Sequence, residues 1–313
     1  MNYKQAYAQF IIPIMLIIPL GIQADPPPEV PPTNVTSLAA RVTELEAMVA
    51  ALTEKLACVS SSSDRTDLFF EGCNVHVRNG SGQTDSINSL GNLVIGYNED
   101  FYPPSPKDRS GSHNLIVGSD HTYNSYGGFV AGLKNSVTGP HASVSGGTEN
   151  TASGDYSSVS GGVNNQASGL FSSASGGSLN KATGESSNVS GGSQNIASGR
   201  DSSVSGGNSN TASGRDSSVS GGGGNSASGR YSSVSGGSVG SAESLASSVS
   251  GGNANYAAGG DSSVSGGYHN VASGDRSSVS GGSENEASGL FSSVLGGNNQ
   301  STATTYGTIP LLP

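Results

Sequence analysis

The stretch S-S-V-S-G-G-N-S-N-T-A-S-G-R-D, residues 202–216, decides the fold, because the chain repeats this unit with small changes eleven times. The valine slot recurs at one fixed interval from Val144 through Val159 to Val294, and Ala174 is the one replacement in it. A Gly-Gly pair follows each residue in this slot, and an asparagine and an alanine follow in nearly every repeat. A period this short and this regular predicts identical coils stacked on one another rather than a globular core.

One coil of a parallel β-solenoid accounts for this unit, since fifteen residues suffice for two short strands and two turns. In S-S-V-S, the alternation of a strand sends valine to one face and its flanking serines to the other. The glycine pair turns the chain, because glycine enters positive φ without steric cost. The segment x-N-x-A forms a second short strand or extended arm, and Ser-Gly turns it back. We therefore predict a mainly β chain.

The asparagine slot predicts a ladder that runs along the stack. Stacked coils lie roughly 4.8 Å apart, so Asn150 and its counterparts should form hydrogen bonds from coil to coil, as amide side chains do in cross-β structures. Gly240 and Gln300 replace asparagine in this slot. We expect the ladder to be weakest at Gly240.

The apolar core of such a solenoid is thin, because each coil offers one valine and one alanine. Burying a valine contributes about 1.5–3 kcal/mol, whereas ordering the backbone costs roughly 1–2 kcal/mol for each residue. A lone solenoid is marginal on this basis, which predicts an oligomer. The alternative is a disordered Gly/Ser linker. The strict register of valine, asparagine and alanine argues against it.

Composition and the N-terminus indicate an exported chain. The formal charge of −10 disfavours nucleic acid as a partner. Lys4 precedes an apolar run over residues 10–22, and Ala24 is a small residue at a cleavage position. This pattern predicts a signal peptide over residues 1–24 and a secreted or cell-surface location. A retained membrane anchor is the alternative, but the run is short for a span of about 20 residues. Residues 25–34 form a Pro-rich spacer.

Residues 35–58 carry a heptad pattern that predicts a short α-helical coiled coil. Valine at a with leucine at d by itself favours two strands. The segment Arg41-Val42-x-x-Leu45-Glu46 resembles the R-h-x-x-h-E motif associated with three-stranded coils, and we predict a homotrimer. The alternative is a helix that packs its apolar stripe on the solenoid. The predicted trimer seam consists of Val35, Leu38, Val42, Leu45, Val49, Leu52 and Leu56.

Two cysteines follow, Cys58 at the end of the predicted coiled coil and Cys73 in a predicted strand over residues 68–77. Export to an oxidising compartment allows a disulfide. A bridge within the chain would join the helix to the first β element, and bridges between chains would join the trimer. The sequence leaves both open. Two cysteines without paired histidines do not predict a metal site.

The segment 59–142 is a transition between helix and repeats, with bulkier apolar residues that predict a better-packed cap for the stack. An inserted loop at 99–112 contains Pro103, Pro104 and Pro106. The 15-residue repeats then occupy residues 143–304, followed by a tail at 305–313. The cap contains three related units, at residues 92–98, 114–120 and 128–135, and the third is already in register with the repeats because Asn135 plus 15 gives Asn150.

Taken together, these patterns resemble the head of the YadA-type trimeric autotransporter adhesins, over about residues 90–300. The resemblance implies a left-handed parallel β-roll in which three chains associate. The family's repeat is usually one residue shorter and more apolar, and its neck and stalk follow the head rather than precede it. Its C-terminal barrel anchor has no counterpart before Pro313. We therefore expect the trimer to be released or held noncovalently.

On this interpretation the protein is an extracellular or cell-surface structural or adhesive fibre head, without catalysis or cofactors. Its ligand would be a protein or a glycan on a host or environmental surface. Aromatic and arginine side chains are common anchors of binding surfaces. An equal alternative is that the aromatic residues seal the trimer. The candidate adhesive residues, which share two adjacent outward slots, are Tyr156, Phe171, Arg200, Arg215, Arg230, Tyr231 and Phe291.

Other functions have weaker support in the sequence. The regular serine rows allow ice binding or another flat-face solenoid function, although such faces usually rely on threonine. A polysaccharide-acting solenoid enzyme or a phage-tail-like spike is a further alternative, because carboxylates recur near one slot. The G-x-S-x-G match at residues 236–240 is expected by chance in a Gly/Ser-rich chain and lacks the strand–turn–helix context. His113, Asp120, His121 and Tyr123 are near one another in the cap and are a minor candidate for metal or acid–base chemistry.

Overall fold

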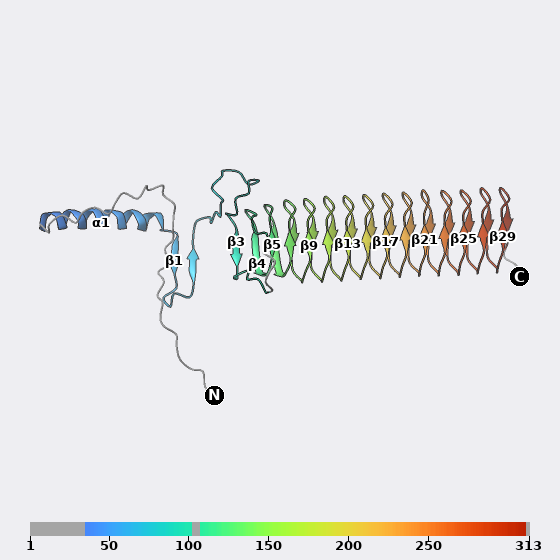
Figure 1. Ribbon diagram of the computed structural model, residues 1–313, viewed down its shortest axis with the longest axis horizontal. Helices are drawn as coiled ribbons and strands as arrows, with labels where there is room; N and C mark the ends of the chain where they lie inside the picture. Colours follow the sequence, from blue (N-terminus) through green and yellow to red (C-terminus); the bar gives the residue numbers. More distant parts are fainter. Residues whose placement is uncertain (1–34, 102–106, 311–313) are drawn as a thin grey trace, which may run out of the picture. The chain divides into compact units, whose positions relative to one another are not determined.

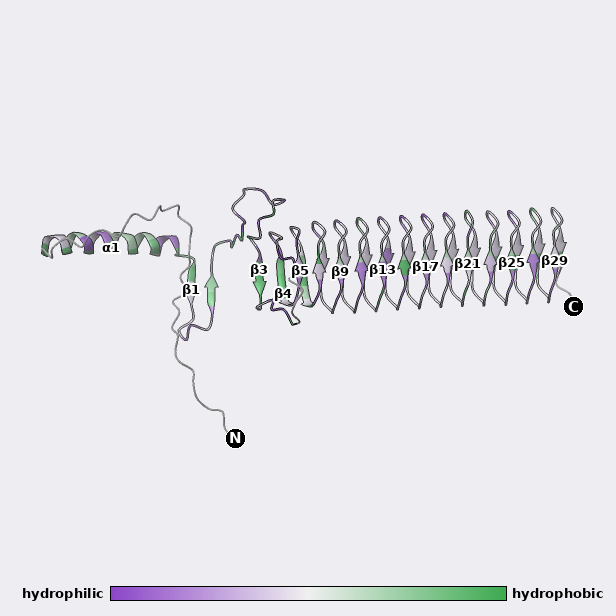
Figure 2. Ribbon diagram, in the orientation of Figure 1, coloured by the Kyte–Doolittle hydropathy of each residue, from purple (hydrophilic) through white to green (hydrophobic). Residues whose placement is uncertain are grey.

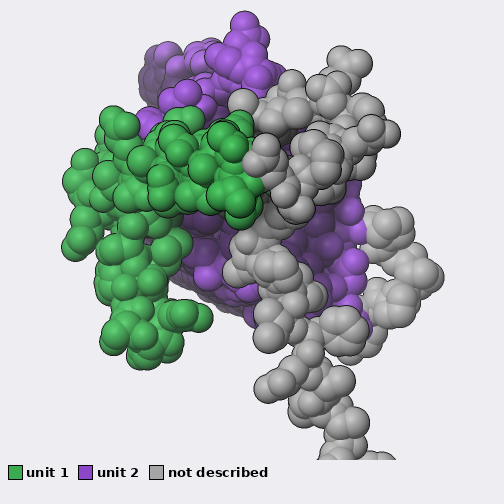
Figure 3. Space-filling view, turned by 90° about the vertical axis from the view of Figure 1, so that its left-hand side faces the viewer, with its two compact units in different colours: residues 1–75 green, residues 76–313 purple. Residues whose placement is uncertain are grey.

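The computed structural model describes residues 35–101 and 107–310. These residues divide into two compact units, of which the first ends at Val75 and the second begins at His76 (Figures 1 and 3). The predicted signal peptide and Pro-rich spacer fall on residues 1–34 and lie outside the described residues. Within the described part of the chain, no helix has the length and apolar character that a membrane span requires.

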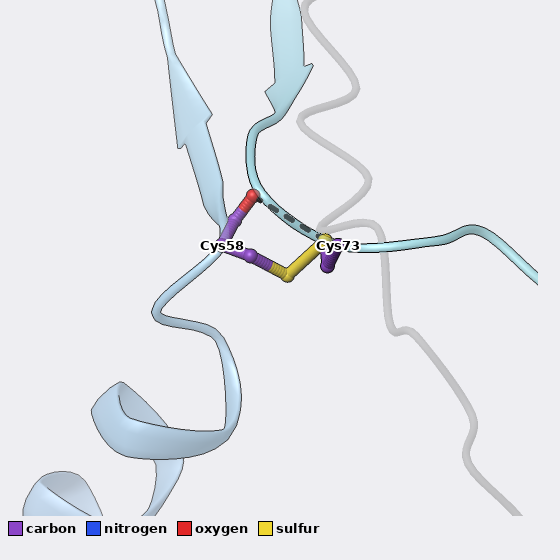
Figure 4. Close-up of a disulfide and its surroundings, with 2 residues drawn as sticks. All are labelled: Cys58 and Cys73. Atoms are coloured by element: carbon purple, nitrogen blue, oxygen red, sulfur yellow. Dashed lines mark hydrogen bonds between the residues drawn. A yellow bond between two sulfur atoms is a disulfide. The ribbon is translucent and has the colours of Figure 1, made fainter.

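The first unit consists of one helix and one hairpin. Helix α1 (Val35–Lys55) is rich in the good helix formers alanine, leucine and glutamate, and Lys55 in its last turn complements the helix dipole. Strands β1 (Val59–Ser61) and β2 (Leu68–Phe70) pair antiparallel. The strand expected over residues 68–77 is therefore shorter than predicted. A disulfide between Cys58 and Cys73 joins the two ends of the hairpin within the chain (Figure 4).

The second unit is a parallel β-solenoid, as the repeat predicts, and Figure 1 shows its coils stacked in a row. Each coil of the repeats contributes one strand to each of two parallel sheets. The first, which we call the valine sheet, contains β3 (Leu93–Ile95), β4 (Leu115–Ser119), β6 (Phe129–Leu133), β8 (Ser143–Val144), β10 (Ser158–Val159), β12 (Ser173–Ala174), β14 (Asn188–Val189), β16 (Ser203–Val204), β18 (Ser218–Val219), β20 (Ser233–Val234), β22 (Ser248–Val249), β24 (Ser263–Val264), β26 (Ser278–Val279), β28 (Ser293–Val294) and β30 (Thr308–Ile309).

The second sheet, which we call the alanine sheet, provides the other wall of the core. Because β30 of the valine sheet pairs with β28, the solenoid extends into the segment expected as a tail from residue 305. The alanine sheet contains β5 (Thr122–Tyr123), β7 (Ser136–Val137), β9 (Thr151–Ala152), β11 (Gln166–Ala167), β13 (Lys181–Ala182), β15 (Ile196–Ala197), β17 (Thr211–Ala212), β19 (Ser226–Ala227), β21 (Ser241–Ala242), β23 (Tyr256–Ala257), β25 (Val271–Ala272), β27 (Glu286–Ala287) and β29 (Ser301–Thr302).

The register places like residues on one another, so each slot of the repeat becomes a column along the stack. Val204 pairs with Val219, one repeat further on, and Ala212 pairs with Ala227. The valine and alanine columns are buried, with exposed fractions of 0–1%. This confirms the predicted core of one valine and one alanine for each coil. A serine column fills a further inward slot. The Ser202 hydroxyl donates to the carbonyl oxygen of Gly199 at 2.7 Å, whereas the buried hydroxyls of eight other members, Ser217 and Ser232 among them, have no hydrogen-bond partner.

The asparagine column is buried and hydrogen-bonded, but its partners are backbone groups rather than the neighbouring amides that a cross-β ladder would use. The backbone N–H of Asn210 donates to Oδ1 of Asn195 at 3.0 Å. Its own Nδ2 donates to the carbonyl oxygens of Gly206 (2.9 Å) and Gly222 (3.0 Å). Each asparagine therefore joins its own turn to the coils on both sides. At Gly240 this series is interrupted, because glycine has no amide to continue it.

Glycine has two different roles in the coil. In the pair Gly206-Gly207, only the second residue has positive φ, at 86°. In the Ser-Gly turn, glycine is required for close approach: a Cβ on Gly214 would lie 2.0 Å from the carbonyl oxygen of Gly229 in the next coil. The positive φ of that turn falls two residues later, on the non-glycine Asp216 (57°). The turn chemistry is therefore more varied than the sequence predicted.

The cap coils differ from the repeats in period and size. Leu115 pairs with Phe129, and Phe129 with Ser143, so these coils follow a 14-residue period. Strands β4 and β6 have five residues each, whereas the repeat strands have two. Ile116 and Val130 occupy the core column at 0% and 1% exposure. The bulkier core expected for the cap is present, and Figure 2 shows β3 and β4 as more hydrophobic than most repeat strands.

Candidate functional site

The candidate adhesive residues lie on one turn of each coil, between the alanine sheet and the valine sheet. In the turn from Gly154 to Ser157, the N–H of Ser157 donates to the Gly154 carbonyl at 3.1 Å. Tyr156 has a φ of 55°, and its N–H donates to the Pro140 carbonyl in the preceding coil at 2.9 Å. Positive φ costs an ordinary residue roughly 1–2 kcal/mol. Intercoil hydrogen bonds offset that cost and hold this side chain outward.

We call the column that contains Tyr156 the corner column, and its side chains vary from coil to coil. Tyr156 and Phe171 are 53% and 56% exposed, so they belong to the accessible surface of the chain. The column consists of His141, Tyr156, Phe171, Ser186, Asp201, Asp216, Tyr231, Ala246, Asp261, Arg276, Phe291 and Tyr306.

An aromatic ladder occupies the part of the corner column next to the cap. His141 stacks on Tyr156 with ring centroids 5.1 Å apart, and Tyr156 stacks on Phe171 at 5.2 Å. Tyr126 meets the His141 ring edge-on at 5.1 Å. Stacking covers the faces of the middle rings, so their edges remain for contact with a ligand. Such an arrangement is rigid, because each ring restricts its neighbour.

The middle of the corner is charged but locally neutralised. Arg200 lies 3.2 Å from the Asp201 carboxylate and 3.6 Å from that of Glu185. Arg215 lies 3.3 Å from Asp216. These side chains are largely exposed, so each pair contributes little to stability. The arginines expected as anchors therefore form a strip of alternating charge rather than a positive patch.

Cations and rings alternate further along the same corner. The Arg230 guanidinium lies 4.6 Å from the ring centre of Tyr231 and donates to its hydroxyl at 2.7 Å. Arg276 lies 5.1 Å from the ring centre of Phe291, and Phe291 stacks on Tyr306 at 5.0 Å. Phe291 is half-buried by these contacts. A cation over an aromatic face contributes about 0.5–1 kcal/mol at exposed sites.

Sequence reasoning missed several members of this surface. It identified Tyr156, Phe171 and Phe291 but not their stacking partners His141 and Tyr306. The signal was available, because each of these partners occupies the same slot one repeat away from Tyr156 or Phe291. The neighbouring ring of Tyr126 and the cation of Arg276 were missed as well. The predicted residues do not form one site: the structure distributes them over two aromatic segments and the charged strip between them.

The candidate polar residues of the cap mostly contact backbone groups, and their side chains do not converge on one site. The ring of His113 accepts from the Asn79 N–H at 3.1 Å and contacts the Thr84 carbonyl at 3.0 Å. Asp120 is buried and lies 3.6 Å from Nζ of Lys107. Among residues 35–101 and 107–310, no three His, Cys, Asp or Glu side chains are grouped in a way that could hold a metal ion.

His121 has a structural role that the sequence did not reveal. Its N–H donates to Oδ1 of Asn98 (2.8 Å), its Nδ1 accepts from the Asn135 N–H (3.1 Å), and its Nε2 donates to the Val117 carbonyl (3.1 Å). These are the bonds that an asparagine makes in the repeats. His121 is 0% exposed, and desolvation lowers its pKa below the ordinary value. The imidazole thus replaces an amide as a neutral group.

The predicted trimer seam is exposed along the whole helix. Its seven side chains have exposed fractions from 42% at Leu56 to 81% at Val35, and α1 has no buried residue. Leu56 lies just beyond the last helical residue, Lys55, but its N–H still donates to the Leu52 carbonyl at 3.0 Å. This apolar stripe is therefore not buried in the single chain.

Compared with known proteins, the chain matches no family model, and no curated protein is significantly similar to it.

Proposed function

We propose that this chain is an extracellular or cell-surface fibre head, structural and adhesive rather than catalytic, which acts as a homotrimer. In this proposal the solenoid is a left-handed β-roll of the YadA-type adhesin kind, presented on an N-terminal three-stranded coiled coil. The 14-residue spacing of the cap coils supports the resemblance, because that family's repeat is usually one residue shorter than the repeat of this chain.

The exposed corner column is the observation that carries the adhesive role. Six of its twelve positions hold Tyr, Phe or Arg. Rigid aromatic side chains bind with little loss of conformational entropy, since few torsions remain to be ordered. Their exposed edges and the Tyr156 hydroxyl suit a protein or glycan surface. A long row of such residues would act by summing weak contacts along the fibre.

The exposed helix supports the trimeric assembly. A stripe of seven apolar residues at heptad spacing is stable in water when other helices cover it. Sedimentation of residues 25–313 tests this directly, and we expect a mass three times that of one chain. A monomer at micromolar concentration would contradict the assembly.

The adhesive role is tested with substitutions that the corner column already contains. Tyr156→Ser with Phe171→Ser removes both rings, and Ser186 occupies the same slot in the next coil. The matched control is Asp201→Ser with Asp216→Ser, and a further variant replaces Arg200, Arg215 and Arg230 with serine. Binding is measured on a glycan array and on plates coated with serum proteins.

We expect the aromatic variant to lose most binding while its sedimentation stays unchanged. The control should retain binding. If only the arginine variant loses binding, the adhesive contacts lie on the charged strip. If these variants and a further one, Tyr231→Ser with Phe291→Ser, all bind as the wild type does, the adhesive role is wrong and a purely structural fibre remains.

A further inference from the structure

The repeats provide an internal comparison, because eleven copies of one unit differ at some outward slots and not at others. The corner column holds seven residue types between His141 and Tyr306. The outward slot of the alanine sheet is equally varied, with Lys181, Ile196, Tyr256 and Glu286 among its members. Outward positions of this solenoid therefore tolerate almost any side chain. A slot that does not vary needs a reason.

Burial supplies that reason for the inward valine, alanine, asparagine and serine columns, but three outward columns are also nearly invariant. They border the outer side of the valine sheet. The columns of Ser203 and Ser205 hold serine in nearly every coil, and the column of Gly206 holds glycine from Gly146 to Gly296. We call these three columns the serine face.

From Gly146 to Gly281, nothing within the chain requires glycine in the Gly206 column, whereas Gly296 at its end has a positive φ. A Cβ on Gly206 would have no atom within 4 Å, and the same holds for nine equivalent glycines from Gly146 to Gly281. The φ of Gly206 is not in the positive range, so the backbone conformation is open to any residue. Ser205 beside it is exposed. Glycine that is kept without local need indicates close approach by something outside the chain.

We propose that the serine face is the seam along which further copies of this chain pack in the homotrimer. The proposal rests on the assembly proposed above and assigns it a surface. A missing Cβ at ten successive coils lets the backbone of the neighbour approach closely, while serine hydroxyls supply hydrogen bonds across the contact. The side chains of the corner column and of the outer side of the alanine sheet then face away from this contact.

Three observations identify the occupant as a second copy. The serine face carries no charged residue, whereas the chain as a whole has a net charge of −10, so like-charge repulsion is least there. A partner must match a spacing of roughly 4.8 Å over ten coils, and another copy has that spacing. Independently, the exposed seam of α1 is the kind of apolar stripe that further copies of the same helix cover.

The serine face is long but narrow, so the contact that it offers is small. Ten coils at roughly 4.8 Å each, and a width of about 10 Å, give about 480 Å² on each copy. Two such faces total roughly 960 Å², which is below the roughly 1,200–2,000 Å² of a standard stable interface. The coiled coil adds to this, so neither contact needs to hold the assembly alone.

Glycine substitution tests the seam without disturbing the coil. Gly206→Val, Gly221→Val and Gly236→Val add side chains where the chain itself leaves open space. The matched control is Thr211→Val, Ser226→Val and Ser241→Val, in a column that already contains Val271. Circular dichroism should show both variants folded. Sedimentation equilibrium of residues 25–313 should show at least about tenfold weaker association for the glycine variant only.

Cysteine cross-linking locates the contact even if the coiled coil alone keeps the copies together. We expect Ser205→Cys to give covalent dimers with a short bis-maleimide and Ser226→Cys to give none. Cross-linking through Ser226→Cys, or equal association of both valine variants, would overturn the seam while leaving the assembly intact. A monomeric wild type would overturn both proposals. Thermal hysteresis from such a monomer would assign the serine face to ice.

Discussion

The cap and the repeats share one architecture but hold it together differently. In the cap, five-residue strands bury Ile116 and Val130, and the coils follow a 14-residue period. In the repeats, two-residue strands bury one valine and one alanine, and the coils follow a 15-residue period. Figure 2 shows this as a change from green to paler strands. The cap relies on apolar volume, which the repeats largely lack.

The repeats compensate with contacts that depend on position rather than on size. Each asparagine ties three coils through their backbones, and each glycine of the Ser-Gly turn lets the next coil approach its Cα closely. Such a coil tolerates few changes at its inward slots, although it contains little hydrophobic material. The comparison therefore teaches that register, not core volume, orders the long part of this molecule.

Charged residues introduced into the thin core should lower the stability of the fold most. Val204→Asp with Val219→Asp places two carboxylates at positions with exposed fractions of 0% and 1%. Burying an unpaired charge costs several kcal/mol, and the two-residue strands offer no compensation. We expect loss of the β spectrum and of the cooperative thermal transition. The control, Thr211→Asp with Ser226→Asp, lies in an outward column that contains Glu286 and should melt as the wild type does.

The two kinds of turn glycine should respond differently to one methyl group. Gly214→Ala places a Cβ 2.0 Å from the Gly229 carbonyl, whereas Gly206→Ala meets nothing within 4 Å. We expect the first to lower the free energy of unfolding by about 1–3 kcal/mol. The second should leave the unfolding of a single chain unchanged. Denaturant titration at a concentration where the chains are separate distinguishes them, and equal effects would refute the close-approach explanation.

The interrupted asparagine column offers a stabilising substitution. Gly240→Asn restores the amide, which should bond to the carbonyls of its own turn and the next coil as Asn225 does at 2.8 and 3.1 Å. Two or three recovered hydrogen bonds should raise the free energy of unfolding by about 1–2 kcal/mol. Ser238→Asn is the control, because its slot already holds Asn208 and Asn253. A destabilised Gly240→Asn variant would mean that this coil has adapted to glycine.

The cap should differ from the repeats in its response to acid. Burial lowers the pKa of His121, so the unfolded chain takes up its proton first as pH falls through the ordinary value of 6.5. Stability is therefore complete above that pH and is lost below it. His121→Asn should keep the bonds to Asn135 and Val117 and flatten this dependence. Melting temperatures between pH 8 and pH 5 test it, and parallel curves for both proteins would contradict the role given to His121.

The period and the inward slots could be read from the sequence, because burial acts on residue type alone. The partners of Asn210 could not, since they follow from where the backbone carbonyls of Gly206 and Gly222 point. His121 was read as a candidate site for the same reason: a histidine that replaces an asparagine shows no motif. At the corner column, the sequence supplied the aromatic residues but not the charge pairing of Arg200. That pairing depends on side-chain positions within one turn.

The like-on-like register also makes the length of the solenoid adjustable in whole coils. Removing residues 204–218 would join Ser203 to Val219, which reproduces the link between Ser203 and Val204 in the intact chain. Every column would close again, and the stack would be shorter by roughly 4.8 Å. The distance between the first and last coils of the solenoid can therefore change in steps of one 15-residue coil without redesign of the inward contacts.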